Sequence, residues 1–212
     1  MTKPEDVLPP VLPFSPAAER NREAILAVLA GWLAPQAAVL EVASGTGQHA
    51  EHFCGARPGW QWQPTEAEPA ALPAIAARCA RQPGVAAPLP LDVLAAEADT
   101  EAWPRRPGGW DAVFCANLIH IAPWPVAPAL LQGAARVLAP GGCLVLYGPY
   151  RVDGEPLSPG NQAFDADLRD RNPAWGLRRL SAVQEAGQAA GLAFVERVDM
   201  PANNLMLRWR LA

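Results

Sequence analysis

The stretch from residue 39 to residue 53 constrains the fold of this chain more than any other part of the sequence. It begins V-L-E-V, a short run of apolar and β-branched residues that predicts a buried strand. A tight turn of small residues follows at 44–47, and residues 48–53 have the composition of a helix start. A strand, a glycine turn and a helix form the first half of a βαβ unit, which binds nucleotides at its turn.

The glycines make this turn a candidate cofactor site. Gly45 and Gly47 have no Cβ, so they accept positive φ and let the backbone approach a ligand closely. The free N–H groups at the start of the helix then face that ligand. Ala43 and Ser44 belong to the same turn, and we assign all four residues to cofactor binding.

Two classes of cofactor compete for the turn. The run from Gly45 to Ala50 matches the G-x-G-x-x-G/A dinucleotide pattern literally, which alone is weak evidence. Glu41, four residues before Gly45, favours the other class, because a carboxylate there repels a pyrophosphate and tolerates a cation. E-x-x-x-G-x-G resembles motif I of the class I S-adenosylmethionine (AdoMet) methyltransferases, so we also assign Glu41 to the cofactor.

Length, composition and charge exclude several classes of protein. The 212 residues, half of them apolar, suffice for one α/β domain, which we place at 16–212 after an extended proline-rich arm at 1–15. The net charge is −4 and no Lys/Arg run is present, so we expect no nucleic acid partner. We find neither a membrane span nor a signal peptide, and therefore expect a cytoplasmic protein that does not contact membranes. Nothing in the sequence indicates the oligomeric state.

Cysteine and histidine give no metal pattern. Four cysteines are far apart and form no C-x-x-C pair, namely Cys54, Cys79, Cys115 and Cys143. In a cytosolic chain we expect them to be reduced core residues rather than a nucleophile or metal ligands. His49 and His52 are three residues apart without an H-E-x-x-H pattern, so we interpret both as structural and predict no metal.

The hydrophobic pattern predicts alternating strands and helices along the rest of the chain. Helices are expected over 16–33, 69–81, 97–103, 126–138 and 181–190, and further strands over 60–65, 87–93, 110–116, 143–147, 192–200 and 205–211. A long loop is expected at 151–172, and such loops often act as lids or binding loops. The connection at 201–204 is so short that it joins antiparallel neighbours.

Polar residues at the carboxyl ends of these strands extend the candidate cofactor site. Glu66 ends the second strand 19 residues after Gly47, where an acid binds the ribose hydroxyls of a nucleoside. Its alternative role is the N-cap of the next helix, which Glu68 can also fill. Asp92, beside Val93, ends the third strand and can accept a hydrogen bond from an adenine amino group. Asn117 follows the fourth strand, where the winding of the sheet reverses and the ligand crevice opens.

Several short stretches between residues 17 and 204 resemble, in the same order, the methyltransferase-like 26 family. They are A-A-E-R-N, L-E-V-A-S-G-T-G-Q-H-A, W-Q-P, L-D-V, Y-G-P-Y, N-P-A-W-G-L-R and V-D-M-P-A-N-N. Glu66 departs from the family, which more often has Asp after W-Q-P. The resemblance implies the Rossmann-like class I methyltransferase fold, in which helices cover both faces of a seven-stranded, mostly parallel sheet with an antiparallel last strand. The resemblance also implies a pocket for AdoMet, which methyl transfer converts to S-adenosylhomocysteine (AdoHcy). It does not indicate the methyl acceptor.

Methyl transfer from a sulfonium is an in-line displacement that needs alignment of the acceptor and, for a protonated acceptor, a base. The candidates for the base, which the sequence does not rank, are His120, Tyr147, Tyr150 and Asp165. His120 has the alternative role of a satisfied core histidine. Arg20, beside Asn21, can bind the carboxylate of the methionine moiety or of a substrate, and its alternative is a solvated helix face.

Three functions follow from these interpretations, in decreasing order of support. The first is an AdoMet-dependent methyltransferase acting on a small or medium-sized acceptor. The second is a non-catalytic scaffold that binds AdoMet or AdoHcy and acts through another protein. The third is an NAD(P)-dependent oxidoreductase that uses the literal glycine match.

Overall fold

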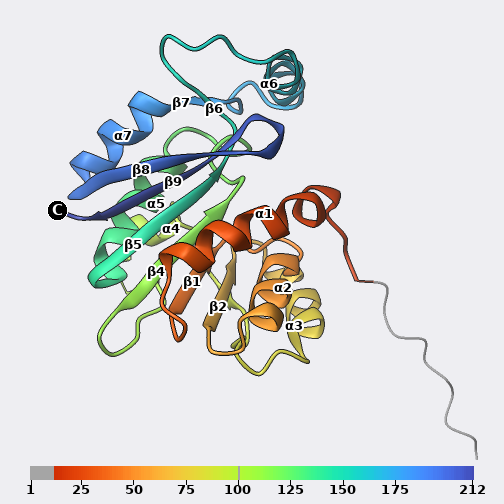
Figure 1. Cartoon of the computed structure of the whole chain (residues 1–212), viewed down its shortest axis with the longest axis vertical. Helices are drawn as coiled ribbons and strands as arrows, with labels where there is room; N and C mark the ends of the chain where they lie inside the picture. The colour runs from red at the N-terminus through yellow and green to blue at the C-terminus, as the bar shows by residue number, and fades with distance from the viewer. Residues whose placement is uncertain (1–11, 100) are drawn as a thin grey trace, which may run out of the picture.

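A seven-stranded sheet forms the centre of the molecule (Figure 1), as shown by a computed structural model that describes residues 12–99 and 101–212. The strands lie in the order β3-β2-β1-β4-β5-β9-β8. Their bounds are β1 Ala38–Val42, β2 Gln61–Glu66, β3 Leu89–Pro90, β4 Trp110–Ala116, β5 Leu138–Gly148, β8 Leu192–Met200 and β9 Asn204–Leu211. The extended arm predicted for 1–15 lies largely outside the described residues.

Strand directions confirm the predicted fold class. β1 pairs in parallel with β2 and β4, and β4 pairs in parallel with β5. β9 is antiparallel to both β5 and β8, and the short 3-10 turn η2 (Pro201–Asn203) joins β8 to β9 as predicted. The chain proceeds from β1 towards β3 on one side and from β4 towards β5 on the other, so the winding reverses between β1 and β4. Ligand crevices of open α/β sheets lie at this reversal.

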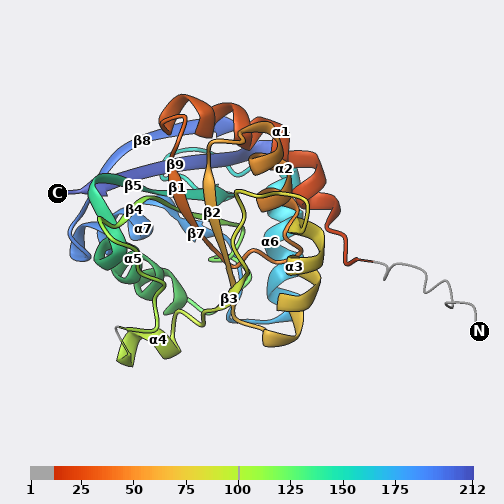
Figure 2. The same ribbon diagram turned by 90° about the horizontal axis from the view of Figure 1, so that it is seen from below.

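Helices cover both faces of the sheet (Figure 2). On one face are α1 (Pro16–Trp32), α2 (Gln48–Ala56) and α3 (Leu72–Cys79), and on the other are α4 (Ala95–Ala98), α5 (Val126–Val137) and α7 (Leu180–Ala189). Strand residues alternate between the two cores, because successive side chains point to opposite faces. Val39 and Phe114 pack in the α1–α3 core, whereas Leu40 and Val113 pack in the core that contains α5 and α7. Every residue of β1 is buried, as expected of a central parallel strand.

Two Ser-Pro pairs begin helices. Ser15 Oγ accepts a hydrogen bond from the Ala18 N–H at 3.2 Å and Pro16 occupies the first helical position, as the sequence predicts. Ser158 does the same for α6 (Pro159–Arg171), since its Oγ accepts from the Asn161 N–H at 3.3 Å. The predicted long loop at 151–172 was therefore wrong over most of its length. Its low hydrophobicity concealed a helix whose start carries the same capping signal.

Other predicted boundaries were also wrong in part. β3 is shorter than the predicted 87–93, because Pro88 and Pro90 have no N–H to donate to a ladder. β5 begins at Leu138 rather than 143, because residues 139–142 belong to the strand, where its register against β4 shifts. α4 occupies Ala95–Ala98 instead of 97–103, and the helix predicted at 69–81 is divided into η1 (Pro69–Ala71) and α3.

Residues 150–179 form an excursion between β5 and α7, which we call the insert. It consists of β6 (Tyr150–Arg151), α6 and β7 (Arg178–Arg179), and its two strands pair in parallel. Figure 1 shows α6 beyond the end of the central sheet from which the insert leaves. Within the described residues, no helix is both long and apolar enough to cross a membrane.

Candidate functional site

The turn after β1 has the backbone shape that a ligand-binding loop needs. Ala43, Gly45 and Gly47 all have positive φ, at 58°, 58° and 75°. A Cβ built on Gly45 meets no atom within 4 Å, so the space beside this residue is open. A Cβ on Gly47 lies 3.1 Å from Ile75 Cγ2, so Gly47 is needed for close packing of α3. The turn therefore presents Gly45 to a ligand and fixes the start of α2 through Gly47.

Glu41 lies beneath this turn rather than in open space, with only 1% of its surface exposed. Its Oε2 accepts hydrogen bonds from Ser44 Oγ at 2.8 Å and from Trp62 Nε1 at 2.9 Å. Burial raises the pKa of Glu41 to about 7, and the two hydrogen bonds only partly oppose this effect. The carboxyl group is therefore close to half protonated at neutral pH. Its direct contacts hold the turn to β2.

His49 joins Glu41 to a buried polar network. Its Nδ1 lies 3.9 Å from Glu41 Oε1, and its Nε2 lies 2.8 Å from Asn21 Oδ1. Burial lowers the pKa of His49 to about 4, so the ring is neutral and Nε2 carries the hydrogen that Asn21 accepts. The Asn21 side chain also acts on Tyr147, because it opposes the rise in the pKa of the Tyr147 hydroxyl that burial causes. The network thus connects β1, α1 and the end of β5. From the sequence alone, its histidine, His49, is interpreted only as structural.

Glu66 lies against the glycine turn, where the ribose was expected. Its Oε2 accepts the Gly45 N–H at 2.8 Å, and its Oε1 accepts the Ala67 N–H at 2.9 Å. Glu68 fills the alternative role, because its side chain caps η1 through the Ala70 N–H. The carboxylate of Glu66 is therefore free of helix capping and borders the open space beside Gly45.

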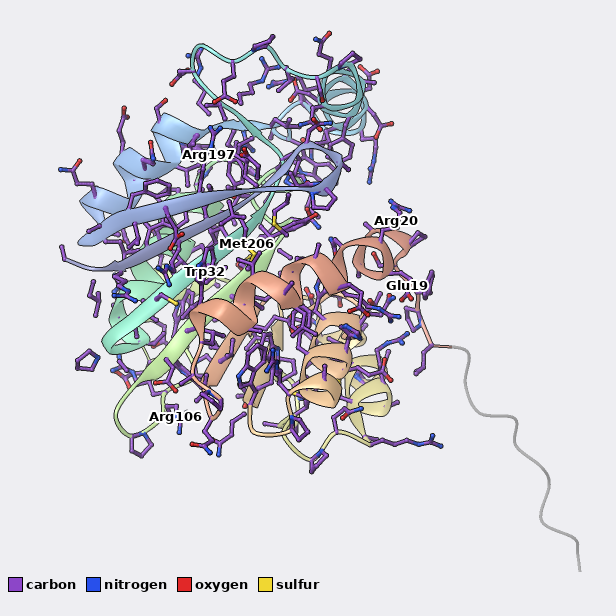
Figure 3. All side chains as sticks on the ribbon, viewed as in Figure 1. Glu19, Arg20, Trp32, Arg106, Arg197 and Met206 are labelled. Atoms are coloured by element: carbon purple, nitrogen blue, oxygen red, sulfur yellow. The ribbon has the colours of Figure 1, made fainter. Side chains whose placement is uncertain are left out.

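Asp92 and Asn117 follow the carboxyl ends of β3 and β4, at the same edge of the parallel sheet as the glycine turn. Asp92 is exposed, and its Oδ1 accepts the Leu94 N–H at 2.9 Å, while Val93 is buried in the core. Asn117 has a positive φ of 62° and donates its backbone N–H to the Tyr147 carbonyl at 2.8 Å. Arg20 is exposed near the N-terminal end of α1 (Figure 3). Burial raises the pKa of Tyr147, and Asn21 and the positive charge of Arg20 oppose this rise.

His120 lies under α6 at the end of β4. The ring is 3% exposed and meets Phe164 of α6 edge to face, with 5.5 Å between ring centroids. A Cβ on Gly148 would lie 3.3 Å from the His120 ring, so the glycine lets β5 pass beside it. Burial, helped by the nearby Arg178, lowers the pKa of His120 to about 4. The ring is neutral at pH 7 and can accept a hydrogen bond, but it is a weak base.

Asp165 and Tyr150 have structural contacts instead. Asp165 accepts hydrogen bonds from Arg151, from Arg169 at 3.1 Å and from the Leu177 N–H at 2.7 Å. Burial alone would raise the pKa of Asp165, but these donors outweigh it and hold the pKa below its usual range. Tyr150 is packed in the hydrophobic core, and burial raises the pKa of its hydroxyl above the normal value. Neither group has the properties of a base at neutral pH.

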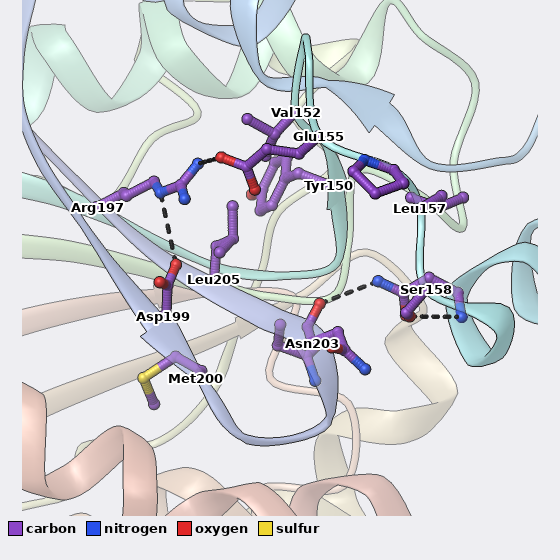
Figure 4. A pocket seen from close by; sticks show the side chains of 13 residues that line it. Tyr150, Val152, Glu155, Leu157, Ser158, Arg197, Asp199, Met200, Asn203 and Leu205 are labelled. Carbon is purple, nitrogen blue, oxygen red and sulfur yellow. Dashed lines mark hydrogen bonds and ion pairs between the residues drawn. The ribbon is translucent and has the colours of Figure 1, made fainter.

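A cavity of about 290 Å³ lies between the insert and the β8–β9 hairpin (Figure 4). Arg197 lines the cavity and forms ion pairs with Glu155 at 2.9 Å and with Asp199 at 3.4 Å. Tyr150 and Leu205 supply an apolar side. None of the glycine-turn residues lines this cavity, so it is separate from the space beside Gly45.

Metal ligands do not gather in the part of the chain that the structure describes. No group of three His, Cys, Asp or Glu side chains lies within reach of one ion there. All four cysteines are free and buried. Burial raises the pKa of Cys143 to about 11 and that of Cys54 and Cys79 to about 12, so these thiols stay protonated at neutral pH.

The sheet order, the reversal between β1 and β4 and the glycine turn define a Rossmann-like fold of the class I methyltransferase type. Mitomycin 7-O-methyltransferase MmcR superposes with a TM-score of 0.76 at 16% identity, covering 92% of this chain and 54% of that chain. Human N-acetylserotonin methyltransferase in complex with SAM gives 0.74 at 13% identity, covering 92% and 52%. SAH-bound CalO1, a methyltransferase in calicheamicin biosynthesis, gives 0.70 at 15%, covering 92% and 55%. At these identities the likeness shows the fold, and this chain spans little more than half the length of each.

The chain belongs to the family described as "Protein of unknown function (DUF938)", whose model matches residues 12–211. This match identifies DUF938 and not the methyltransferase-like 26 family, so membership of the latter stays a prediction.

Proposed function

We propose that this protein is an AdoMet-dependent methyltransferase that acts on a small or medium-sized acceptor. The observation that carries the proposal is the open space beside Gly45, which lies at the β1–β4 reversal and is bordered by the Glu66 carboxylate. Proteins that share the fold were solved with SAM and with SAH, which supports this cofactor. AdoMet supplies the activated methyl group, so the protein needs only to bind, align and exclude water.

The residues around the turn fit the parts of AdoMet. The Gly45 backbone has room for the ligand, and Glu66 can exchange its bond to Gly45 for two ribose hydroxyls. Asp92 can accept a hydrogen bond from the adenine amino group through Oδ2, since its Oδ1 already accepts the Leu94 N–H. Exposed Arg20 can bind the carboxylate of the methionine end, and Asn117 follows β4 at the reversal where the crevice is expected. Glu41 acts from below by fixing Ser44 and by supplying negative charge near the cationic sulfur.

Tyr147 is our leading candidate for contact with the acceptor. Asn21 accepts the His49 hydrogen through Oδ1, so its amide N–H groups are available to the Tyr147 hydroxyl, whose pKa Asn21 lowers. Asn21 and His49 are then positioning residues. His120, neutral at pH 7, is placed to accept a hydrogen bond from an acceptor group, whereas Asp165 and Tyr150 hold the insert in place.

A non-catalytic AdoMet-binding protein is the second candidate, and one observation favours it. His120 and Tyr147 are only 3% and 4% exposed, and α6 covers His120. A substrate therefore reaches His120 only if α6 moves, which a protein that merely binds the cofactor would not need.

Calorimetric titration with AdoMet, AdoHcy and NAD tests the cofactor. We expect AdoMet and AdoHcy to bind, Glu66→Ala to weaken binding by about tenfold or more, and NAD not to bind. Glu68→Ala is the matched control, since Glu68 caps η1 two residues away and makes no contact with Gly45. Tight NAD binding, or equal effects of both variants, would overturn the assignment.

AdoHcy release in the presence of a fractionated metabolite extract distinguishes the two candidate functions. A methyltransferase releases AdoHcy with at least one fraction, and Tyr147→Phe lowers the rate while leaving AdoMet affinity unchanged. AdoMet binding without any release across all fractions would support the non-catalytic alternative.

A further inference from the structure

Four arginines line one pocket on the insert, although the chain as a whole has a net charge of −4. The pocket measures about 380 Å³, and its arginines come from three elements, namely Arg151 of β6, Arg169 of α6 and the adjacent Arg178 and Arg179 of β7. Trp124, in the loop before α5, forms another wall. No acidic residue lines the pocket. It shares no residue with the glycine turn.

The positive charge of this pocket is only partly compensated by the described residues. One carboxylate, Asp165, serves both Arg151 and Arg169. Arg179 pairs with Asp153 at 3.1 Å, and Asp153 also accepts the Ser181 hydroxyl. Arg178 bonds only to backbone carbonyls, those of Ile119, Ala122 and Ala174. Four guanidinium groups thus face two carboxylates, which leaves an excess of two positive charges.

The unused hydrogen-bonding capacity points in the same direction. Each guanidinium group has five N–H donors in a planar fork. The hydrogen bonds above use a minority of these donors, and the side chains of Arg151, Arg169 and Arg179 are 45%, 49% and 70% exposed. Burial lowers the pKa of Arg178, and repulsion from the neighbouring Arg169 adds to this effect. A compact dianion relieves this repulsion and accepts several N–H donors at once.

Trp124 makes the pocket selective for the substituent that the anion carries. Arg178 lies over the Trp124 ring, with its Cζ 5.9 Å from the ring centroid. The indole is 36% exposed, so a planar or apolar group can pack on it while an anionic group meets the arginines.

We propose that this pocket, formed by Arg151, Arg169, Arg178, Arg179 and Trp124, binds a small phosphomonoester with an aromatic or apolar substituent. Two carbonyls that Arg178 holds, those of Ile119 and Ala122, flank His120, and the Gly176 N–H donates to the His120 carbonyl at 2.9 Å. The pocket is therefore joined to the loop that carries His120 through Arg178. The proposal does not depend on the cofactor assignment.

Calorimetry at low ionic strength with inorganic phosphate, phenyl phosphate and neutral benzyl alcohol tests it. We expect phenyl phosphate to bind more tightly than inorganic phosphate, benzyl alcohol not to bind, and affinity to fall as salt is added. Trp124→Leu should abolish the preference for phenyl phosphate and leave inorganic phosphate binding unchanged. Absence of binding by both phosphates at millimolar concentration would overturn the proposal.

The site is located by comparing variants that remove a positive charge from the pocket with one that removes a negative charge. Arg179→Gln should weaken phenyl phosphate binding about threefold, and Arg169→Gln with Arg179→Gln about tenfold. Asp153→Asn removes a competing carboxylate and should tighten binding about threefold, an effect that loss of folding cannot produce. Arg57→Gln with Arg81→Gln changes the net charge equally on exposed surface elsewhere and should have no effect. Equal weakening by the control and by the pocket variants, or no tightening by Asp153→Asn, would show that the anion binds elsewhere.

Discussion

Replacement of Asp165 separates the structural role that we assign to this residue from the catalytic role that the sequence indicated. The carboxylate is 5% exposed and joins the three parts of the insert, through Arg151 of β6, Arg169 of α6 and the Leu177 backbone before β7. Asp165→Ala leaves the buried Leu177 N–H without an acceptor, which costs about 1–3 kcal/mol. The two arginines are about half exposed, so losing each pair costs at most about 1 kcal/mol.

We therefore expect Asp165→Ala to lower the free energy of unfolding by about 2–4 kcal/mol, or to release the insert locally by a similar amount. In a domain of this size that corresponds to a fall in Tm of about 4–16 °C. Thermal unfolding measures the global effect, and hydrogen exchange of the Leu177 amide detects local opening.

Asp167→Asn is the matched control, because Asp167 is on the same helix but exposed, with a single 3.7 Å pair to Arg171. It should change Tm by less than about 1 °C. The reasoning also gives a pH dependence. Since the pKa of Asp165 is lowered in the folded protein, its contribution is present above the ordinary carboxyl pKa and is lost as pH falls through the lowered value. A stable Asp165→Ala variant with unchanged Leu177 exchange would refute the structural assignment.

Three other predictions concern the turn and its network. Burial raises the pKa of Glu41 to about 7, so the contribution of Glu41 to the free energy of unfolding is greatest below the ordinary carboxyl pKa and is lost as pH rises through 7. Glu41→Gln should remove this loss and narrow the difference in unfolding free energy between pH 5 and pH 8.5 by a few kcal/mol in denaturant titrations. An unchanged difference would contradict this prediction. Gly47→Ala should lower the free energy of unfolding by about 1–3 kcal/mol, because Gly47 has a φ of 75° and a Cβ there would contact Ile75. Gly45→Ala should lower stability less and weaken AdoMet binding more. Equal effects of the two variants in calorimetry and thermal unfolding would refute this division of roles. His49→Ala should destabilise the protein by about 1–3 kcal/mol, since Asn21 loses its buried donor. His52→Ala, which loses a pair with exposed Glu23 and an edge contact with Phe53, should cost less than His49→Ala in the same thermal scan.

The sequence predicted those features that depend on neighbouring residues. The alternation of apolar strands, the glycine turn and the Ser15-Pro16 cap are local signals, and the structure confirms the fold class that they indicated. The short connection at 201–204 likewise specified antiparallel neighbours, because its length leaves no other geometry.

The sequence did not reveal contacts between distant residues. His49 and Asn21 are 28 positions apart, and no local pattern shows that their side chains meet. Asp165 was a candidate base because a carboxylate in a loop has no visible partner in sequence, whereas α6 brings two arginines to it. The insert was missed for a related reason. Its helix buries few apolar residues, so hydrophobic periodicity is weak and only the Ser158-Pro159 cap marks its start.

A crystal structure of the protein with AdoHcy bound tests the central claim most directly. We predict that the ribose hydroxyls lie within hydrogen-bonding distance of the Glu66 carboxylate and that the homocysteine backbone passes beside Gly45. AdoHcy found in the cavity of Figure 4, or a glycine turn that engages a pyrophosphate when NAD is supplied, would contradict the assignment.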